Sequence, residues 1–525
     1  MSARFSNVSS PNPVDERGRP GPASTIVLCG AGVSLAEPSS VPSWWGFNQA
    51  VLGELRQRFL AEHRVPVRAA NALSRLSLDD LDVAEFSQVV ADAFAGDTWF
   101  DSLRALDGER PNINHHVLAE LAKQGRLQVV LTTNFDTLIE RAMQQIGVAV
   151  RVSDVFADSP PKIAGSADEV RVVKLHGTCS RHSTLVDLGS QKRRGLPTGW
   201  LDWLQTSFRG AEVLVVGFSG ADLAMRPDYL RLEAAASEIS SMRWLASSRP
   251  NEQVNELLRL GGTKFSLVPG YIPDAWTSLR VDQTVVDRAR DRVDAPATAS
   301  VEASRPPDIG AVIDQWLAHP LVDADTCGLA LTRLLDAASR KSAAQALRVS
   351  ISTRVRRALR AGLPYSAVPR AALQIGQIAA DEPPGRTTNA LYCLDLASRA
   401  FDALMEHAAA DMRTNQMVQQ ELAHNRANLI GNRAYVLLVS GDPTVLSQAA
   451  SAAEEAWKVA ADRLTGLRRD QHESSYWELR GAIELARGSL ENARGCLLKA
   501  DELSLRAGNL RRHRAVAKQL RRLES

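Results

Sequence analysis

Four short apolar runs in the first half of the chain each end in a small or polar motif, and this pattern constrains the fold more than any other feature. An apolar run that leads into a glycine turn is typical of a buried parallel strand followed by a helix. The runs alternate with stretches of helical spacing, which predicts a parallel sheet covered by helices on both faces. The motifs are Gly30-Ala31-Gly32-Val33-Ser34, Thr133-Asn134-Phe135-Asp136, Leu175-His176-Gly177 and Gly217-Phe218-Ser219.

The expected elements follow this alternation. Strands are expected over residues 25–29, 127–132, 170–175, 213–216, 243–246 and 265–268. Helices are expected over residues 111–125, 136–147 and 252–260. Residues 46–107 carry apolar side chains at helical spacing, such as Phe47, Val51 and Leu55, and are predicted to form a mostly helical insertion.

The length of 525 residues indicates more than one domain. Residues 1–23 are rich in Ser, Pro, Asn, Arg and Gly and are predicted to be a disordered leader. Residues 24–280 form the expected α/β domain, with a Rossmann-like parallel sheet. Large apolar residues become rare over 281–308, which we interpret as a linker, and an all-α domain is expected over 309–525.

The C-terminal part shows two similar stretches. Residues 432–435 lead to Gly441-Asp442, and residues 476–479 lead to Gly488-Ser489. Each stretch predicts a helix, a glycine turn and a second, Ala-rich helix, as in tetratricopeptide-like helical hairpins. The offset between the copies is longer than the usual repeat of about 34 residues, so a plain helical bundle is the alternative.

Composition excludes several functional classes. The net charge of +2 gives no global attraction to nucleic acid or to an acidic membrane, and neither is expected as a partner. Five widely separated cysteines fit neither a disulfide framework nor a zinc knuckle, and a reduced, cytoplasmic setting is expected. The basic stretch near the C-terminus is interpreted as a solvated helix face, because no aromatic residues interleave there to stack bases. It contains Arg506, Arg511, Arg512, Arg514, Lys518, Arg521 and Arg522.

The glycine motif after the first strand suits a phosphate. Gly30 and Gly32 permit a tight turn and a close approach of the backbone, and a helix N-terminus supplies N–H donors. The Rossmann spacing Gly-x-Gly-x-x-Gly is absent. A simple strand-to-helix turn therefore remains an alternative interpretation of this motif alone.

The motifs after the next two strands carry polar chemistry. Asn134 can hold a ribose hydroxyl or a water, and Asp136 can orient its neighbours, although either residue can also cap the following helix. His176 is a candidate general base, although a single strand-end histidine is often structural. The small residues after Gly217 suit the adenosine half of a dinucleotide. Together, the four strand ends predict a dinucleotide cleft that contains a base.

At this point the sequence resembles the sirtuin family of NAD-consuming enzymes. The stretch from Pro111 through His115, Leu118, Leu121, Gly125 and Leu127 to Thr-x-Asn-x-Asp follows the family pattern. The resemblance covers roughly residues 24–275. It implies a phosphate loop at Gly30, Ala31, Gly32 and Ser34, a nicotinamide-ribose environment at Thr133, Asn134 and Asp136, a catalytic histidine at His176, and an adenine-side ribose loop at Gly217 and Ser219.

The chain departs from the lysine-deacylating sirtuins at two places. Those enzymes carry four zinc-binding cysteines between the histidine and the later Gly-x-Ser motif, whereas only Cys179 lies in that interval here. No zinc site is therefore expected. The family's Ile-Pro-Asp-Phe-Arg stretch is replaced by residues 41–45, which contain Trp44 and Trp45. This replacement is similar to bacterial sirtuin-like defence effectors, while simple packing of the tryptophans is the alternative.

The resemblance implies an NAD hydrolase that releases nicotinamide and ADP-ribose and depletes cellular NAD in antiphage defence. The helical domain would form a homo-oligomer and respond to a phage-derived trigger or an operon-encoded partner. The alternatives are a protein deacylase, an ADP-ribosyltransferase and a non-enzymatic NAD-sensing scaffold.

Overall fold

The computed structural model describes residues 25–81, 83–93, 99–100, 102–161, 169–181, 184–247, 249–294, 309–317, 324–360, 391–392, 394–395, 398, 416–507 and 509–524. The expected leader, and the part of the expected linker beyond residue 294, lie outside these residues. The chain divides into two compact units. The α/β unit contains residues 1–43, 106–186 and 195–307, and the helical unit contains residues 44–105, 187–194 and 308–525.

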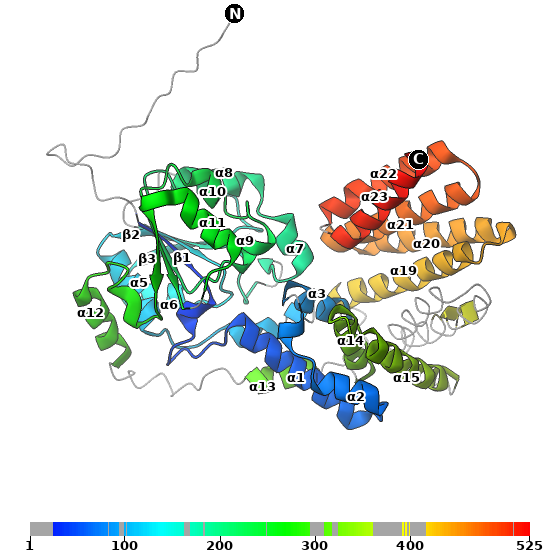
Figure 1. Cartoon of the computed structure of the whole chain (residues 1–525), viewed down its shortest axis with the longest axis horizontal. Coiled ribbons are helices and arrows are strands. Elements are labelled where there is room, and N and C mark those ends of the chain that lie inside the picture. The colour runs from blue at the N-terminus through cyan, green and yellow to red at the C-terminus, as the bar shows by residue number, and fades with distance from the viewer. Residues whose placement is uncertain are drawn as a thin grey trace, which may run out of the picture. The chain divides into compact units, whose positions relative to one another are not determined.

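A seven-stranded sheet forms the centre of the α/β unit (Figure 1). Its strands are β1 (Thr25–Cys29), β2 (Leu127–Thr132), β3 (Ala149–Asp154), β4 (Glu169–Lys174), β5 (Glu212–Val216), β6 (Ser241–Ala246) and β7 (Phe265–Pro269). The order is β3-β4-β2-β1-β5-β6-β7, and every neighbouring pair is parallel. The predicted parallel sheet is confirmed, and the edge strand β3 is an addition. It escaped prediction because its first four residues are largely exposed and form no apolar run.

Helices cover both faces of the sheet, as predicted, because alternate strand residues point to opposite sides. Ile26 and Leu28 pack into one core, and Val27 and Cys29 pack into the other. Core residues on the first face come from α8 (Thr198–Ser207), α9 (Ala221–Met225), α10 (Leu232–Ala235) and α11 (Glu252–Gly261). Core residues on the second face come from α5 (Ile113–Lys123), α6 (Leu138–Gln145) and α12 (Gln283–Asp294).

Helix α12 lies in the stretch that the sequence assigned to a linker. Val285, Val286 and Ala289 on this helix are buried in the core on the second face, against residues of α5. The stretch looked like a linker because charged residues dominate the rest of the helix. Burial of one narrow apolar stripe was enough to hold it on the sheet unit.

The helical unit combines the insertion with the C-terminal region. Its helices from the insertion and the short return segment are α1 (Trp44–Glu62), α2 (Val67–Ser74), α3 (Val83–Ala93) and α7 (Gly189–Arg194). The mostly helical insertion is confirmed, and Phe47, Val51 and Leu55 are buried. These helices pack with α13 (Ile309–Leu317), α14 (Ala324–Ala337) and α15 (Lys341–Arg360). The sequence analysis had instead included the insertion in the α/β domain over residues 24–280. The boundaries of the functional domains stay a prediction.

The last helices form packed pairs, as predicted. Helix α19 (Gln416–Val439) packs against α20 (Leu446–Arg463), and α21 (Gly466–Ala486) packs against α22 (Leu490–Arg506). Helix α23 (Leu510–Glu524) packs against α22. Gly441 and Gly488 occupy the two turns with positive φ, which glycine adopts without strain. Within the described residues, no helix is both long enough and apolar enough to cross a membrane.

Candidate active site

Four adjacent strands deliver the four sequence motifs to one edge of the sheet. In the order β4-β2-β1-β5, these strands lead to His176, Asn134, Gly30 and Gly217 respectively. Their last residues are level, because Cys29 pairs with Thr132 and with Val216, and Thr132 pairs with Lys174. Strands β2 to β4 lie on one side of β1, and the chain then crosses to place β5 to β7 on its other side, so β1 is a topological switch point. Open α/β sheets bind ligands in the crevice at such a point.

The two glycine loops pack backbone against backbone. The Gly32 amide donates a hydrogen bond of 3.0 Å to the Gly217 carbonyl. A Cβ atom on Gly30 would lie 2.5 Å from the Gly217 oxygen, and one on Gly32 would lie 2.6 Å from the Gly217 Cα. The glycines are therefore required for this contact between loops. Ala31 and Gly32 remain partly exposed beside it, so the strand-to-helix turn and a phosphate loop are compatible interpretations.

Ser34 is the centre of a buried polar network. Its hydroxyl donates to the Asp136 carboxylate at 2.9 Å and accepts from the Asn134 amide nitrogen at 3.2 Å. His115 Nε2 lies 3.1 Å from the same hydroxyl. His115 Nδ1 accepts from the Asn112 amide, so its proton is on Nε2 and points to Ser34. Burial, together with His116 and Lys174, lowers the pKa of His115 to about 3, which keeps the ring neutral.

This network fixes the Asn134 side chain and leaves one of its atoms unused. The amide nitrogen also lies 3.2 Å from the Asp136 carboxylate, while the Asn134 main chain donates to the Thr132 hydroxyl at 3.0 Å. The Asn134 side-chain oxygen is buried and has no hydrogen-bond partner among the described residues. A buried acceptor without a donor is costly. A ligand hydroxyl or a water would satisfy this oxygen.

Asp136 both helps to cap the following helix and orients its neighbours, the two roles that the sequence analysis left open. Its carboxylate accepts from the Leu138 amide at 3.1 Å and so supports the start of helix α6, while it also holds Ser34 and Asn134. Burial raises the pKa of this carboxyl, and Lys174 and the Ser34 hydroxyl oppose the rise.

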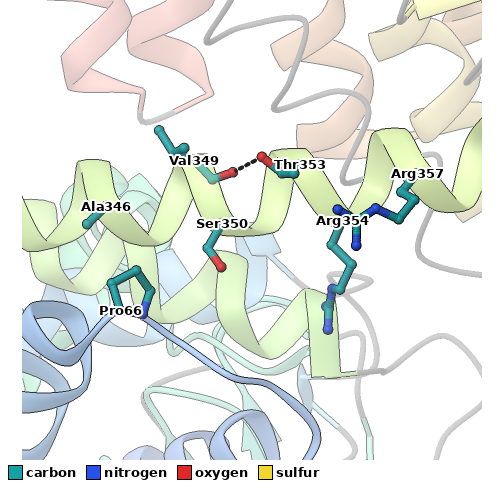
Figure 2. Close-up of a pocket in the computed structure, with 7 residues that line it drawn as sticks. All are labelled: Pro66, Ala346, Val349, Ser350, Thr353, Arg354 and Arg357. Atoms are coloured by element: carbon teal, nitrogen blue, oxygen red, sulfur yellow. Dashed lines mark hydrogen bonds between the residues drawn. The ribbon is translucent and has the colours of Figure 1, made fainter.

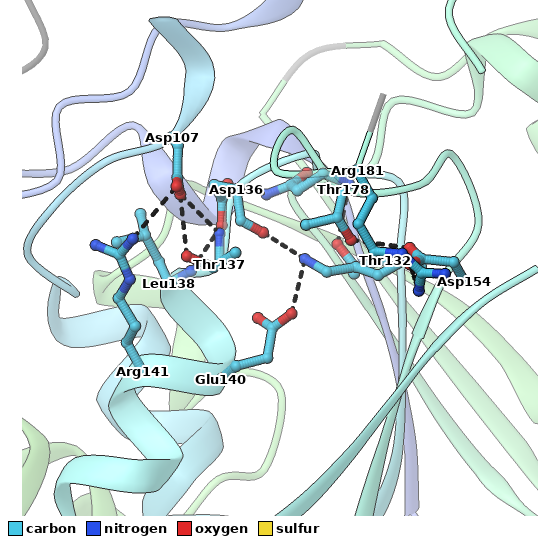
Figure 3. A network of polar contacts seen from close by, with 12 residues as sticks. Asp107, Thr132, Asp136, Thr137, Leu138, Glu140, Arg141, Asp154, Thr178 and Arg181 are labelled. Carbon is cyan, nitrogen blue, oxygen red and sulfur yellow. Dashed lines mark hydrogen bonds and ion pairs between the residues drawn. The ribbon is translucent and has the colours of Figure 1, made fainter. Parts of the chain in front are cut away.

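Charged side chains also contact the loop over residues 133–137, which we call the Asn134 loop; Asp107 and Thr137 are labelled in Figure 3. Lys174 Nζ donates to the main-chain oxygen of Asp136 and lies 3.0 Å from Glu140. Asp107 accepts from the Thr137 amide at 3.0 Å and pairs with Arg141 at 3.3 Å. These contacts tie the backbone of the loop to β4 and to helix α6.

The residue after His176 must be a glycine. Gly177 has a φ of +82°, and a Cβ atom there would lie 2.2 Å from the Thr184 main-chain oxygen. Thr178 and Arg181 both donate to Asp154, at 2.8 Å and 2.7 Å, which anchors the loop to the end of β3 (Figure 3). The His176 ring therefore has a defined place at the sheet edge.

Three side chains surround the His176 ring. Its Nε2 lies 3.6 Å from the Asp222 carboxylate, and both residues are buried. The Tyr229 ring meets it edge-on, with 5.9 Å between centroids, and the Phe135 ring lies at 6.3 Å. Burial, and then the charge of Asp222, raises the pKa of Tyr229 well above its usual value. Phe135 stands between Asn134 and Asp136, so the imidazole and the polar network share one neighbour.

Cys179, three residues after His176, is a buried free cysteine. Burial, followed by the charge of Asp107, raises the pKa of Cys179 to about 12, and only a thiolate is reactive. Within the described residues, no three His, Cys, Asp or Glu side chains are grouped so that they could hold a metal ion. The expected lack of zinc stays a prediction.

The structure places every predicted site residue at this edge, but their contacts differ. Ser34, Asn134 and Asp136 share one network, and His176 lies beside it. Thr133 donates its amide to the Cys29 carbonyl at 3.1 Å. The Ser219 hydroxyl is exposed and accepts from the Ala221 amide at 3.3 Å. The roles of these residues toward a ligand stay predictions.

Sequence reasoning assigned no role to His115, Lys174, Glu140 or Asp222. The first was quoted only as part of a family pattern. A lysine directly before an apolar residue and a strand-end histidine was a signal, because a charge within a buried strand requires a partner. The partners themselves lie far away in the sequence and could not be named.

Trp44 is held by polar contacts as well as by packing. Its indole nitrogen donates to Asp187 at 2.7 Å, and Trp99 donates to the same buried carboxylate at 2.9 Å. Trp45 is 46% exposed. The hydrophobic-packing interpretation is thus incomplete for Trp44 and does not apply to Trp45.

A separate hollow lies in the helical unit, along α15 (Figure 2). None of its lining residues comes from the strand-end motifs. They are Pro66, Ala346, Val349, Ser350, Thr353, Arg354 and Arg357.

Residues 128–262 match the family model of the SIR2-like domain. The match runs from β2 past β6 and includes Asn134, His176 and Gly217, while the Gly30 loop and most of the helical unit lie outside it. This confirms the sirtuin-like resemblance over residues 128–262, and for the rest of the sheet it stays a prediction. No curated protein matches the chain.

Two solved structures are similar to the chain at low identity. A mutant Sir2 homologue in complex with ADP-ribose is 16% identical, with a TM-score of 0.23, over 53% of this chain and 96% of that one. A STAND-type signal transduction ATPase with a tetratricopeptide repeat sensor, from Pyrococcus horikoshii, is 11% identical, with a TM-score of 0.17, over 94% of this chain and 83% of that one. Both TM-scores are too low to bear on function.

Proposed function

We propose that this protein is an NAD glycohydrolase, which cleaves the bond between nicotinamide and ribose to give nicotinamide and ADP-ribose. One observation carries the proposal. The buried Asn134 side-chain oxygen has no partner among the described residues, while Ser34 and Asp136 hold its amide group in place. His176 lies near the same loop, because its ring is close to the ring of Phe135, the residue after Asn134. A ribose hydroxyl is a suitable donor for that oxygen.

The residues at the sheet edge fit an NAD molecule as substrate. The partly exposed Ala31 and Gly32 would receive the pyrophosphate, because no side chain of Gly32 obstructs it. Asn134 would accept a hydrogen bond from the nicotinamide ribose. Ser219 and Gly217, at the end of β5, would lie along the adenosine half.

The chemistry that NAD supplies is a good leaving group, since nicotinamide departs as a neutral molecule with the electron pair of the broken bond. Positive charge develops on the ribose, and the buried Asp136 carboxylate lies next to Asn134 to stabilise it. A water oxygen forms the new bond to the ribose carbon. His176 would take the proton, either from that water or from a ribose hydroxyl. Asp222, 3.6 Å from the imidazole, would stabilise the protonated ring.

The direct test is NAD cleavage by purified wild type and by His176→Ala and Asn134→Ala. Loss of a positioned general base costs about 10²- to 10⁴-fold, and we expect at least that loss in the His176 variant. Circular dichroism should show that both variants fold. Retained cleavage in both variants would rule out this assignment.

We further propose that the enzyme is an antiphage effector that is inactive until triggered. The support is the resemblance to defence effectors and the presence of a helical unit in the same chain as the sheet unit. Unregulated hydrolysis of NAD would be toxic to the cell, so a low resting activity is expected. We also expect a homo-oligomer formed through the helical unit. Nucleotides extracted from phage-challenged bacteria test this. NAD should fall, and ADP-ribose or nicotinamide should rise, with wild type and not with His176→Ala.

A further inference from the structure

The Lys174 side chain lies under the Asn134 loop, and the reaction above does not use it. Lys174 is the last residue of β4, two residues before His176, and its side chain has no solvent exposure. Lysine is almost never fully buried unless it is paired. Removing an ammonium ion from water costs several kcal/mol. The interactions that Lys174 makes in the folded protein must therefore offset that cost.

The contacts of Lys174 reach the loop at its turning point. Its ammonium group donates to the main-chain oxygen of Asp136 and forms an ion pair with Glu140 at 3.0 Å. The carboxylate of the same aspartate accepts from the Leu138 amide. Lys174 thus joins β4, which leads to His176, to the backbone of the loop that carries Asn134.

Lys174 is also the counter-charge of the buried carboxylates. The groups around Asp136 are Ser34 from the glycine loop, His115 from α5, Glu140 from α6, Cys29 from β1 and Cys179 from the loop after β4. None of these five is a cation at neutral pH. His115 is neutral, and burial raises the pKa of both thiols.

The balance of charge sets the state of Asp136. Burial favours the protonated acid, and Glu140 adds like-charge repulsion, whereas Lys174 favours the carboxylate. Burial also opposes the charge on Lys174, but Glu140 and Asp136 outweigh it and raise the pKa of Lys174. The ammonium group therefore stays charged and divides its attraction between two carboxylates.

We propose that Lys174 is a positioning residue that holds the backbone of the Asn134 loop and keeps Asp136 negatively charged beneath the reacting ribose. Its effect on catalysis rests on the proposed NAD hydrolysis, whereas its effect on Asp136 does not. Glu140 tunes this effect, because it competes with Asp136 for the same ammonium group.

Two variants, one single and one double, should move the titration of Asp136 in opposite directions. In Glu140→Gln, Asp136 is the one remaining carboxylate of the pair that attracts the Lys174 ammonium group. This variant should therefore lower the pH at which Asp136 takes up a proton. The double substitution Lys174→Met with Glu140→Gln removes the ion pair as a unit, which folded proteins tolerate better than the loss of one partner. It should raise that pH, since an opposite charge nearby shifts a carboxyl by about 1–3 pH units.

The experiment is an infrared titration of the protonated carboxyl band in the full-length chain. Each protein is compared with the same protein carrying Asp136→Asn, so that the difference reports Asp136 alone. Glu120→Gln is the matched control. It removes another buried glutamate, which pairs with Arg292 at 3.2 Å and does not contact Asp136, so its midpoint should equal that of wild type.

The midpoints should rank Glu140→Gln below wild type, and wild type below the double variant. Three coincident midpoints would overturn the inference, whether or not the protein cleaves NAD. If the midpoints separate but wild type cleaves no NAD at any pH in triggered cells or in purified form, the proposed function fails and the charge relation stands.

The pH dependence of cleavage gives the second readout. If Lys174 acts through the charge of Asp136, the acid limb of kcat should move to higher pH in the double variant and to lower pH in Glu140→Gln. A merely structural role would reduce kcat by the same factor at every pH. That result would overturn the catalytic part of the inference.

Discussion

The α/β unit and the C-terminal helix pairs differ in what they bury. At the carboxyl edge of the sheet, Lys174, Asp136, Glu140 and His115 are almost fully removed from water. Lys174 contacts Glu140 and the Asp136 main chain, and Ser34 links Asp136 to His115. Between the helix pairs, the buried side chains are mainly small and apolar. They include Ala434, Leu437, Ala449, Ala453, Ala460 and Ile483.

This difference has a physical origin. Strand ends leave a crevice where buried polar side chains from several strands meet, and a network of this kind can be satisfied only by distant partners. Helix pairs with alanine at their contacts approach closely and need no such partners. Buried polar contacts are thus concentrated at the carboxyl edge of the sheet, whereas close apolar packing holds the helix pairs together.

Substitutions of glycine should distinguish the α/β unit from the helical unit as a whole most strongly. A Cβ on Gly32 in the α/β unit would meet the Gly217 backbone at 2.6 Å, so Gly32→Ala should destabilise the protein by about 3 kcal/mol. Gly53 in helix α1 has nothing within 4 Å of its Cβ position, and Gly53→Ala should stabilise by about 0.5–1 kcal/mol. Thermal unfolding followed by circular dichroism measures both. Equal unfolding temperatures for the two variants would break the comparison.

Asp222 should affect chemistry without affecting stability. Asp222→Asn removes the negative charge 3.6 Å from His176 while keeping the shape of the side chain. NAD cleavage should fall by about 10- to 100-fold, part of what a general base contributes, and the unfolding temperature should change little. Asp202→Asn is the control, because its exposed carboxylate pairs with Arg231. An undiminished rate in Asp222→Asn would remove this residue from the site.

His472 sharpens the comparison as an exception in the helix pairs. It is buried, and its Nε2 lies 2.9 Å from Nδ1 of His424. Burial, then Arg512 and Arg468, lowers its pKa from 6.5 to about 4. The unfolded chain therefore binds the proton first as pH falls, so the stability that this residue contributes is complete above about pH 6.5 and is lost toward pH 4.

Acidification from pH 7 to pH 5 should cost about 2 kcal/mol through this residue. His472→Gln should reduce the acid sensitivity of urea unfolding, followed by the helical circular dichroism signal, by that amount. His513→Gln serves as the control, because His513 is partly exposed and pairs with Asp501. The same acid sensitivity in His472→Gln and wild type would show that the buried ring does not titrate with folding.

Local patterns in the sequence located most of the elements. The strand over 127–132 and the helix over 252–260 were found because apolar spacing and end signals lie within the segments themselves. Helix α8 was missed, although Pro197 precedes it and its buried Trp200 and Leu204 have helical spacing. Strand β3 could not be found by the same criterion, because most of its side chains face solvent.

The sequence by itself determined the alternation of strands and helices, the order of the four motifs, and their common position at strand ends. Only the tertiary structure decided which side chains meet. Ser34 contacts residues 81 and 102 positions away, and Lys174 joins the end of β4 to helix α6. The reason is that hydrophobic periodicity is local, whereas these contacts depend on the strand order β4-β2-β1-β5 and on the level ends of its strands.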